Sequence, residues 1–551
     1  MTQVTIFSKP NCQYCARAKA VLKSANVDYR EYDVIASQRN ADASVYFSGV
    51  VTVPQIFIGD YHINGAEDLE KLEAAGRLKQ LLELNTGIIA LDTLSDGELH
   101  EGANDFALRE YIPKSDGSKD KDDESLPILH FYKEFFGFWP NTFAYLHHWK
   151  KAYKLFVYCH NFSAVAYGKQ FLSMKLMSAV GYSTSNAHGC SYCQVHSAAT
   201  GGEQSLNVVE QLKQARQGKN SSFDKSELAL TDLAAAASKN QVDKALVDRL
   251  KSSNADRQSI EGTKMIVAAF GFLNVFNDLT GLEIEGDWAR QAREKTGIEA
   301  GRHGSENSNP ANLDYEIPQG NLSIEDMLEK YDREIGDLET YAQKEFGLLP
   351  AWMQKWPQPL QKRHAYLYGE LMGDREDTLV DSEVKHLMAR VSAIAKGHDY
   401  LAAVEGYMAY HTANDKERAI ERIKQCFITA TNKGDTSSVF SDRETAALQL
   451  AWLSAQVPST TPYRFVKDAI ALYQPQELIH LIVVCSLASM IQRFVAIAQP
   501  EIETEVNEFY TQHSIETDAL KLRYPLALKL EAVRQSSSIY CGEKNIANLS
   551  S

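Results

Sequence analysis

The pattern of hydrophobic and polar positions divides the chain into a short N-terminal part and a much longer helical part. Within residues 1–84, short apolar runs such as 4–7 and 55–58 alternate with amphipathic stretches, which predicts the order β-α-β-α-β-β-α. From residue 127 onward, apolar residues recur at spacings of three and four, and strand-like alternation is scarce. The pattern therefore predicts an α/β unit followed by an all-α region.

Two polar segments divide the chain further. Residues 114–125 contain no apolar residue, so they cannot bury apolar area to offset the entropy of ordering, and we expect a mobile tether there. Residues 301–323 are rich in Asn, Ser, Gly and Pro and predict a second linker. The predicted organisation is a domain at 1–84, a linker at 85–126, a helical domain at 127–300, a linker at 301–323 and a second helical domain at 324–551.

The two helical domains look like copies of one unit. The motif at 136–140 matches the motif at 346–350, as expected for an internal repeat. Residues 190–196 then align with residues 405–411, where a tyrosine and a histidine persist but both cysteines are absent. We therefore expect the second copy to be structural and to lack redox chemistry.

Composition narrows the class of protein. The chain has 551 residues, 44% of them hydrophobic, and a formal net charge of −15, which fits two to four folded domains and argues against a nucleic-acid partner. No signal peptide is visible, and no apolar run reaches the ~20 residues that span a bilayer. We therefore expect no membrane partner and interpret 481–491 as a buried helix. Eight cysteines do not make a disulfide scaffold in a chain of this size, so a cytoplasmic redox enzyme is the expected class.

Four of the cysteines form two Cys-x-x-Cys pairs, Cys12/Cys15 and Cys190/Cys193. In a reducing cell such a pair is either a redox dithiol or half of a metal site. Two pairs in one chain suggest that electrons pass from one to the other. Cys12 opens a predicted helix, whose N-terminal dipole lowers the pKa of a thiol, and Lys9 adds positive charge nearby. We therefore expect Cys12 to be the nucleophile and Cys15 the more buried resolving thiol.

Three motifs in the first 84 residues fall where one known family has them. They are Cys-x-Tyr-Cys at 12–15, Thr-Val-Pro-Gln-Ile-Phe-Ile at 52–58 and Asn-Gly-Ala-Glu-Asp-Leu at 64–69. On these motifs the segment resembles the glutaredoxins, which implies a thioredoxin-like fold with glutathione as reductant. Gln13 and Asn64 depart from the family pattern, where proline and glycine are usual, and Pro54 fits a cis turn beside the dithiol. The resemblance places at the glutathione site Lys9, Tyr14, Thr52, Val53, Pro54, Gly65 and Asp68.

The first helical domain carries a further set of motifs. They are Gly-Phe-Trp-Pro-Asn-Thr-Phe at 137–143, Gly-Cys-Ser-Tyr-Cys at 189–193, and the stretch 265–282 with Asn274, Asn277 and Asp278. On these motifs the domain resembles the carboxymuconolactone decarboxylase and alkylhydroperoxidase D superfamily, and the second helical domain resembles it weakly. The resemblance implies an all-α fold, a homo-oligomer, and a peroxidase chemistry in which Cys193 attacks the peroxide and Cys190 resolves the product. The decarboxylases of the superfamily lack the dithiol, so their activity is not expected.

The proton chemistry departs from this family. The family histidine falls four residues after the second cysteine, whereas His196 falls three after Cys193, and Ser178 stands where the family has a glutamate. His196 lies one helical turn past Cys193, so its side chain can face the sulfur. His188 is a second candidate base, because imidazole titrates near physiological pH, and a loop histidine without a catalytic role is the alternative. The remaining cysteines are interpreted as buried small hydrophobes: Cys159, Cys426, Cys485 and Cys541.

The sequence thus predicts a glutathione-dependent thiol peroxidase. Glutathione reduces Cys12/Cys15, this dithiol reduces the Cys190–Cys193 disulfide, and Cys193 reduces a hydroperoxide, with His196 and His188 moving protons. One alternative is an electron-relay adaptor that reduces a disulfide of a partner protein, for example a peroxiredoxin. Another is a helical assembly scaffold with a vestigial dithiol. A further alternative is a zinc site at Cys190, Cys193 and His196. The helical region has no second ligand cluster in its sequence, so we expect no metal.

Overall fold

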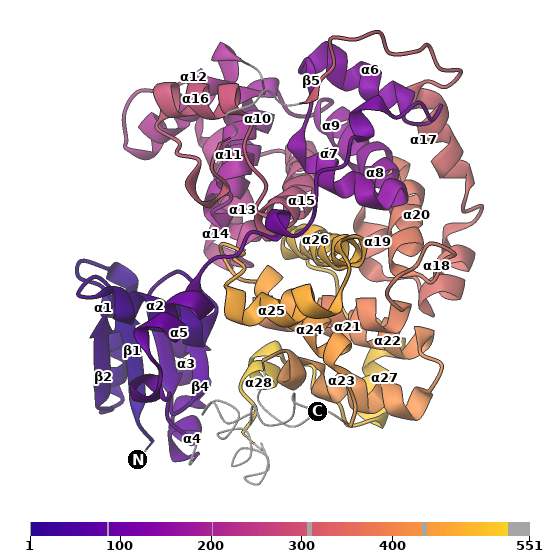
Figure 1. Cartoon of the computed structure of the whole chain (residues 1–551). Helices are drawn as coiled ribbons and strands as arrows, with labels where there is room; N and C mark the ends of the chain where they lie inside the picture. Colours follow the sequence, from indigo (N-terminus) through magenta and orange to yellow (C-terminus); the bar gives the residue numbers. More distant parts are fainter. Residues whose placement is uncertain (1, 85–86, 201, 306–310, 432–437, 527–551) are drawn as a thin grey trace, which may run out of the picture.

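The computed structural model describes residues 2–84, 87–200, 202–305, 311–431 and 438–526. The N-terminal part is a mixed sheet covered by helices, and the remainder is predominantly helical (Figure 1). This confirms the predicted fold class, an α/β unit followed by an all-α region.

Four strands form the sheet in the order β2-β1-β3-β4. β1 runs parallel to β2 and antiparallel to β3, and β3 pairs antiparallel with β4. The predicted last helix is split in two near Gly76, which adopts a positive φ. The elements are β1 (Val4–Ser8), α1 (Gln13–Ser24), β2 (Tyr29–Asp33), α2 (Gln38–Ser48), β3 (Gln55–Ile58), β4 (Tyr61–Asn64), α3 (Ala66–Ala74) and α4 (Leu78–Glu83).

Alternate residues of β1 face opposite sides of the sheet, as strand geometry requires. Val4 and Ile6 pack with α1 and α3, whereas Phe7 packs with α2. The cluster around Phe7 also contains Leu91, and Leu99 of α5 (Asp96–Ala103). The core of this unit therefore extends past the predicted boundary at residue 84, and we use the term N-terminal unit for residues 2–84 and 87–103.

Seven helices of the first helical domain recur in the same order in the second. The first set is α10 (Met174–His188), α11 (Ser191–Ala199), α12 (Glu203–Arg216), α13 (Lys225–Ser238), α14 (Lys244–Ser252), α15 (Arg257–Thr280) and α16 (Gly286–Thr296). The second set is α21 (Ser382–Lys396), α22 (Asp399–Thr412), α23 (Lys416–Ala430), α24 (Asp442–Ser454), α25 (Tyr463–Leu472), α26 (Pro475–Ala498) and α27 (Thr504–Gln512). The first helix of each set has 15 residues and the sixth has 24.

The helix ends correct the predicted register between the two sets. α10 and α21 both end at a left-handed glycine, Gly189 and Gly397, and the next helix begins two residues later in each set. Cys190 therefore corresponds to His398 and not to Glu405. The sequence comparison missed this because α22 has 14 residues and α11 only 9, so the extra residues lie after this point. The prediction that the second set lacks a dithiol is unaffected.

α15 and α26 cross at the centre of the helical part (Figure 1). A Cβ on Gly271 would lie 2.9 Å from both Met490 Cα and Ser489 O, so the close crossing needs glycine. Gly271 and Ser489 are each the fifteenth residue of a 24-residue helix, so the two sets meet at equivalent positions. Both helices are long and apolar enough by composition alone to be membrane-span candidates. However, 72% and 89% of their most apolar windows are buried, which fits the predicted buried helix at 481–491.

The other helices pack around this pair. The strand β5 (Phe138–Trp139) pairs with β6 (Ala311–Asn312), which lies in the predicted linker 301–323; residues 306–310 of that linker lie outside the described residues. The remaining helices longer than three residues are α6 (Leu126–Phe135), α7 (Asn141–Leu146), α8 (Lys150–Leu155), the π-helix η5 (Phe156–Phe162), α9 (Ser163–Gly168), α17 (Ile324–Arg333), α18 (Leu338–Phe346), α19 (Ala351–Lys355), α20 (Gln361–Met372) and α28 (Ala519–Arg523).

The expected mobile tether at 114–125 is instead packed against the helical part. Asp122 and Glu124 each lie 2.7 Å from Lys154 Nζ on α8, and Ser118 is buried. The prediction was wrong because it considered only the apolar area of the segment itself: its carboxylates pair with lysines on a neighbouring helix, and Gly117 packs closely against Trp139 and His147.

Candidate functional site

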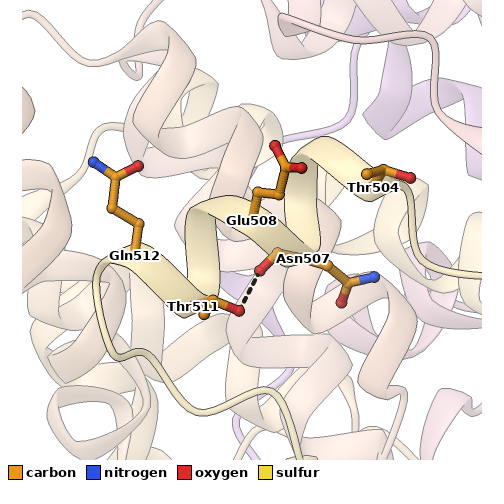
Figure 2. A pocket seen from close by; sticks show the side chains of 5 residues that line it. All are labelled: Thr504, Asn507, Glu508, Thr511 and Gln512. Atoms are coloured by element: carbon orange, nitrogen blue, oxygen red, sulfur yellow. Dashed lines mark hydrogen bonds between the residues drawn. The ribbon is translucent and has the colours of Figure 1, made fainter.

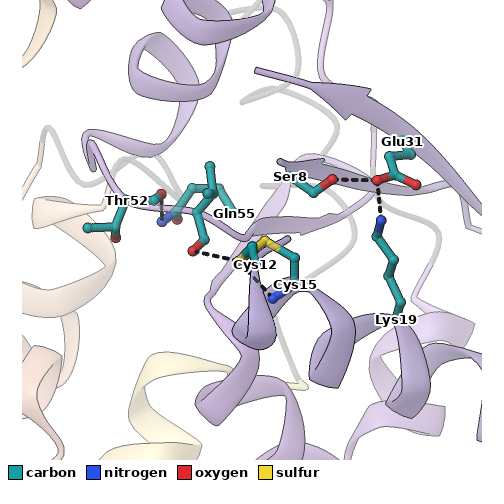
Figure 3. The surroundings of a disulfide bond; sticks show 8 residues. Ser8, Cys12, Cys15, Lys19, Glu31, Thr52 and Gln55 are labelled. Atoms are coloured by element: carbon teal, nitrogen blue, oxygen red, sulfur yellow. Dashed lines mark hydrogen bonds and ion pairs between the residues drawn. A yellow bond between two sulfur atoms is a disulfide. The ribbon is translucent and has the colours of Figure 1, made fainter. Parts of the chain in front are cut away.

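The first dithiol lies at the start of α1. Cys12 is the N-cap, and its Sγ accepts a hydrogen bond from the Cys15 backbone N–H at 3.1 Å. The two cysteines are joined by a disulfide, with Cys15 buried and Cys12 partly exposed (Figure 3). The Val53–Pro54 peptide bond is cis, as predicted, and Val53 O lies 3.9 Å from Cys12 Sγ.

A cavity of about 740 Å³ opens beside Cys12. All seven residues predicted for the glutathione site line one side of it. They are Lys9, Tyr14, Thr52, Val53, Pro54, Gly65 and Asp68. The opposite side belongs to the helical part and is lined by Lys239, Gln241, Ala395, Lys396, Ala455, Gln456, Val457 and Arg523. The dithiol of the N-terminal unit therefore faces the helical part across one shared cavity.

Asp68, one of these cavity residues, is held by the C-terminal part of the chain. Arg523 Nη1 lies 2.9 Å from both Asp68 carboxylate oxygens, and the Tyr524 hydroxyl lies 3.1 Å from one of them. Burial pushes the pKa of Asp68 upward, but Arg523 and a hydrogen bond from Asn64 outweigh it and hold the pKa below its usual range. Asn64, a departure from the family pattern, thus orients this carboxylate.

The second dithiol has the same local geometry and a different environment. Cys190 is the N-cap of α11, and its Sγ accepts a hydrogen bond from the Cys193 backbone N–H at 3.4 Å. Both are free thiols, 0% and 2% exposed. Asn277 Nδ2 of α15 donates to Cys193 Sγ at 3.3 Å. Burial raises the pKa of the Cys190 thiol well above its ordinary value.

Asp278 connects two histidines beside Cys190. His303 Nε2 lies 3.0 Å from Asp278 Oδ1 and 3.9 Å from Cys190 Sγ, and His303 Nδ1 bonds to Leu282 O. His188 Nε2 lies 3.3 Å from Asp278 Oδ2, and burial lowers the pKa of His188 to about 4. Burial would raise the pKa of Asp278, but the two histidines hold it below its usual range. An ionised carboxylate therefore lies between two imidazoles at the dithiol.

His196, predicted to face the Cys193 sulfur, points elsewhere. Its Nε2 lies 2.6 Å from Glu285 Oε2, and its ring stacks on Tyr192. Tyr192 also donates its hydroxyl to Glu285 at 2.9 Å. Among the described residues, no hydrogen bond joins His196 to either sulfur. The geometric prediction was wrong because the buried carboxylate of Glu285 is a stronger acceptor than a thiol and takes the imidazole.

The second helical set contributes a buried cation to this site. Arg493 of α26 donates through Nη1 to Asn274 Oδ1 at 2.7 Å. Burial lowers the pKa of Arg493 to about 10, while Cys193, Cys190 and Asp278 are close enough to act against that shift. A guanidinium in this place favours a thiolate over a thiol. The set that lacks a dithiol thus supplies positive charge to the dithiol of the other set.

The donor atoms near Cys190 could also hold a metal ion. One atom each of Cys190, Asp278 and His303 lies within 4.8 Å of the others, and all three residues are buried. The Nδ1 contact of His303 with a carbonyl leaves Nε2 directed toward the cluster, which is how metal-binding histidines are commonly oriented. The sequence did not indicate this cluster, because a second set of ligands was sought as a paired motif in the helical region, whereas Asp278 and His303 are single residues distant from Cys190.

One short segment separates the two dithiols. Gln456 and Val457 line the cavity beside Cys12. The next residue, Pro458, packs against Gly189, since its Cβ would lie 3.1 Å from a Cβ placed there. Ser459 Oγ then lies 3.4 Å from His188 Nε2. Residues 456–459, between α24 and α25, therefore form a wall with the Cys12 cavity on one side and the residues that precede Cys190 on the other.

Comparison with known proteins identifies the N-terminal unit. A family profile described as Glutaredoxin matches residues 4–63. Glutaredoxin 3 of Escherichia coli K12 is 42% identical over 83 residues, which is 15% of this chain and 100% of that protein. The chain belongs to the glutaredoxin family. Glutaredoxin 1 of Rickettsia typhi is 44% identical over 82 residues, 14% of this chain and 79% of that protein. The N-terminal unit is thus a glutaredoxin domain, a thiol–disulfide oxidoreductase of a family that uses glutathione.

Two solved structures also match. The solution structure of a Brucella melitensis glutaredoxin is 41% identical, with a TM-score of 0.15, over 16% of this chain and 96% of that chain. The crystal structure of a variant of the debrominase Bmp8 in complex with 2,3,4-tribromopyrrole is 16% identical, with a TM-score of 0.27, over 33% of this chain and 91% of that chain. At these TM-scores neither likeness supports a conclusion about the helical part, whose superfamily resemblance stays a prediction.

Several residues at the two sites were not predicted as site residues. His303 lies in a segment whose composition predicts a linker, and Glu285 and Arg493 are remote in sequence from the dithiol. Asp278 lies within the stretch 265–282 on which the superfamily resemblance rests, and that resemblance assigns it no role. Of the unpaired cysteines, the three within the described residues are buried, as predicted, and Cys541 lies outside them.

A second hollow of about 410 Å³ is unrelated to the glutaredoxin domain. It is open to solvent and is lined by five polar residues of α27, of which Thr511 bonds to Asn507 O at 2.8 Å (Figure 2). Because it contains neither cysteine nor histidine, we do not consider it a redox site.

Proposed function

We propose that the chain is a glutathione-dependent thiol peroxidase in which the glutaredoxin domain reduces the dithiol of the helical part. Two glutathione molecules reduce the Cys12–Cys15 disulfide and leave as glutathione disulfide. The Cys12 thiolate then attacks the Cys190–Cys193 disulfide, and Cys15 resolves the mixed disulfide, which restores Cys12–Cys15 and frees both thiols of the helical part. The Cys193 thiolate attacks the O–O bond of a hydroperoxide, which yields an alcohol and a sulfenic acid. Cys190 condenses with that sulfenic acid and releases water.

The observation that carries this proposal is the wall at 456–459. The Cys12 cavity is on one side of it, and Gly189, next to Cys190, is on the other. Because both sulfurs of the second dithiol are buried, Cys12 reaches them only when this wall moves. Electron transfer therefore requires a local opening and not the release of a tethered domain.

The surroundings of the second dithiol support peroxide chemistry. Arg493 and the Asn277 amide stabilise negative charge on Cys193. His303, bonded to Asp278, is the group placed to take a proton from Cys190 or to return one to the leaving oxygen. A small hydroperoxide can reach a buried site without the large opening that a disulfide of a folded partner protein would need. This argues against the adaptor alternative.

A coupled assay tests the proposal. The full chain is given glutathione, glutathione reductase, NADPH and an organic hydroperoxide, and NADPH oxidation is followed. We expect turnover in the wild type and none above background in Cys193→Ser. Turnover that survives Cys193→Ser would show that Cys193 is not the peroxidatic thiol. Turnover that needs an added peroxiredoxin would favour the adaptor, and an unchanging redox state of Cys190 and Cys193 would favour the scaffold.

The cluster of Cys190, Asp278 and His303 favours metal binding as a second candidate function. A Cys190 thiolate bound to a metal ion cannot form a disulfide with Cys193, so the two functions exclude each other at any moment. Metal analysis of the fully reduced chain decides between them: a stoichiometric metal that Asp278→Asn removes would support the second candidate. Cytoplasmic location and homo-oligomer formation stay predictions.

A further inference from the structure

The helical part lines one side of the cavity beside Cys12, and Lys396 is one of the residues that line it. Lys396 is the last residue of α21. Its carbonyl accepts a hydrogen bond from Asn240 Nδ2 at 3.1 Å, so the backbone is fixed where the helix ends. The side chain therefore starts from a fixed position at the cavity.

The side-chain amine of Lys396 is enclosed and, among the described residues, has no hydrogen-bond partner. Burial lowers the pKa of Lys396 well below its ordinary value, and the neighbouring cations Arg493 and Lys239 lower it further. With no anion beside it the enclosed amine therefore favours its neutral form, and an anionic group that reaches it would favour the charged form and be held by it.

The part of the chain that the structure describes offers no free anion to Lys396 in this cavity. The only two carboxylates among its described lining residues are Glu67 and Asp68. Glu67 accepts a hydrogen bond from Gln241, and Asp68 is paired with Arg523. We therefore expect the anion to come with the ligand. Glutathione, the thiol that reacts at Cys12, carries two carboxylates.

We propose that Lys396 binds a carboxylate of the glutathione that reacts at Cys12, so that the helical part supplies half of the thiol site of the glutaredoxin domain. This rests on the proposed function in one respect, which is that glutathione is the reductant of Cys12–Cys15. It goes beyond that function by assigning a ligand-binding residue outside the glutaredoxin domain. It also predicts that the chain reacts faster with glutathione than with thiols that carry no carboxylate.

The test compares a charged and an uncharged thiol on the full chain. Wild type and Lys396→Met are treated with glutathione or with 2-mercaptoethanol, the reaction is quenched by alkylation, and mass spectrometry follows reduction of Cys12–Cys15. We expect Lys396→Met to slow glutathione about tenfold, the loss of one charge-assisted hydrogen bond, and to leave 2-mercaptoethanol within about twofold. Equal slowing of both thiols, or of neither, would overturn the proposal.

Lys385→Met is the matched control. Lys385 lies on the same helix and is buried, but its Nζ donates to Gly373 O at 2.9 Å and it does not line the cavity. We expect this variant to react with glutathione at the wild-type rate. Because Lys396 has no hydrogen-bond partner within the described ranges, we also expect Lys396→Met to melt no lower than the wild type in the absence of ligand, whereas a structural lysine would lower the melting temperature.

Binding of S-methylglutathione, which cannot be oxidised, separates this proposal from the proposed function. Calorimetry should show about tenfold weaker binding to Lys396→Met than to the wild type. If glutathione does not reduce the chain but this difference in binding is found, the proposed function is wrong and the binding role of Lys396 is supported. If glutathione reduces the wild type and Lys396→Met equally and binding does not differ, the binding role of Lys396 is wrong and glutathione remains the reductant in the proposed function.

Discussion

The two dithiols of this chain share one local geometry and differ in almost everything around it. Cys12 and Cys190 are both N-caps whose sulfurs accept a hydrogen bond from the backbone N–H three residues on. Cys12 is partly exposed at a cavity, whereas Cys190 is 0% exposed. A helix N-terminus stabilises a negative charge by about 0.3–1 kcal/mol, and up to about 2 kcal/mol when partly buried. Full burial shifts a pKa by up to about 3–5 units, or roughly 4–7 kcal/mol.

At Cys190 the effect of burial on the pKa is larger than the effect of the helix N-terminus, so the thiol pKa is raised. The comparison teaches that a Cys-x-x-Cys motif at a helix start is not sufficient for a reactive thiolate. The buried dithiol depends on charges from elsewhere in the fold, Arg493 of the second helical set and the carboxylate Asp278 between two histidines. Each prediction below alters one side of this comparison and should leave the other side unchanged.

The largest effect is expected for Asp278→Asn. The change removes the buried carboxylate that pairs with His188 and His303, so His303, the proposed base at Cys190, loses the charge that orients it and stabilises its protonated form. We expect hydroperoxide turnover to fall by roughly 10²–10⁴-fold, the range for general acid–base groups. Stopped-flow measurement of peroxide reduction by the fully reduced chain checks this. Reduction of Cys12–Cys15 by glutathione should stay at the wild-type rate.

Glu285→Gln is the matched control for Asp278. Glu285 is also a buried carboxylate bonded to a histidine, but that histidine, His196, has no hydrogen bond to a sulfur among the described residues. We expect less than about a tenfold loss of turnover. If Glu285→Gln costs more turnover than Asp278→Asn, the proton pathway runs through His196, as the sequence predicts, and not through Asp278.

The pH dependence of stability is the next largest effect. Burial lowers the pKa of His188 to about 4 in the folded chain, whereas the unfolded chain keeps a pKa near 6.5, so the unfolded state binds the proton more readily. Its contribution is fully present above pH 6.5 and is lost as the pH falls toward 4, by roughly 3 kcal/mol in all. Denaturant unfolding at pH 7 and pH 5 should show a smaller loss of stability on acidification in His188→Gln than in the wild type.

Other buried histidines make the comparison between variants necessary. Burial also lowers the pKa of His364 and His398 to about 3, so the wild type loses stability in acid for several reasons. His100→Gln, at an exposed histidine of the glutaredoxin domain, serves as the control and should follow the wild type. An identical acid response in His188→Gln and the wild type would mean that His188 is not a buried neutral imidazole.

A moderate effect is expected where the C-terminal part of the chain meets the glutaredoxin domain. Arg523 pairs with Asp68, a carboxylate of the Cys12 cavity that we expect to bind the ammonium group of glutathione. Arg523→Gln should free Asp68 and lower the KM for glutathione by about three- to tenfold. The control is Lys521→Gln, an exposed change on the same helix α28, and it should leave the KM unchanged. A raised KM in Arg523→Gln would show that Arg523 binds glutathione itself.

Features that depend on residues close together in the sequence could be predicted, and features that depend on distant segments could not. The order of strands and helices along the chain, the cis bond at Pro54 and the seven cavity residues follow from motifs within 84 residues. The surroundings of Cys190 could not be predicted in the same way, because His303 and Arg493 come from distant segments and reach the dithiol only through the packing of α15 against α26. His196 was misplaced because helical spacing indicates which face a side chain shares, not which acceptor it prefers.

The smallest effect is expected for a change in residues 114–125, the segment that the sequence predicts to be a tether. Asp122 lies 2.7 Å from Lys154 and 3.0 Å from Lys150, and these are partly exposed ion pairs. Such pairs contribute up to about 1 kcal/mol, so Asp122→Asn should lower the free energy of unfolding by no more than that. Electron transfer should be unchanged, because the wall at 456–459 and not this segment separates the two dithiols. A rate of Cys190–Cys193 reduction that rises in Asp122→Asn would mean that release of residues 114–125 limits transfer, and the two dithiols would then communicate by domain movement.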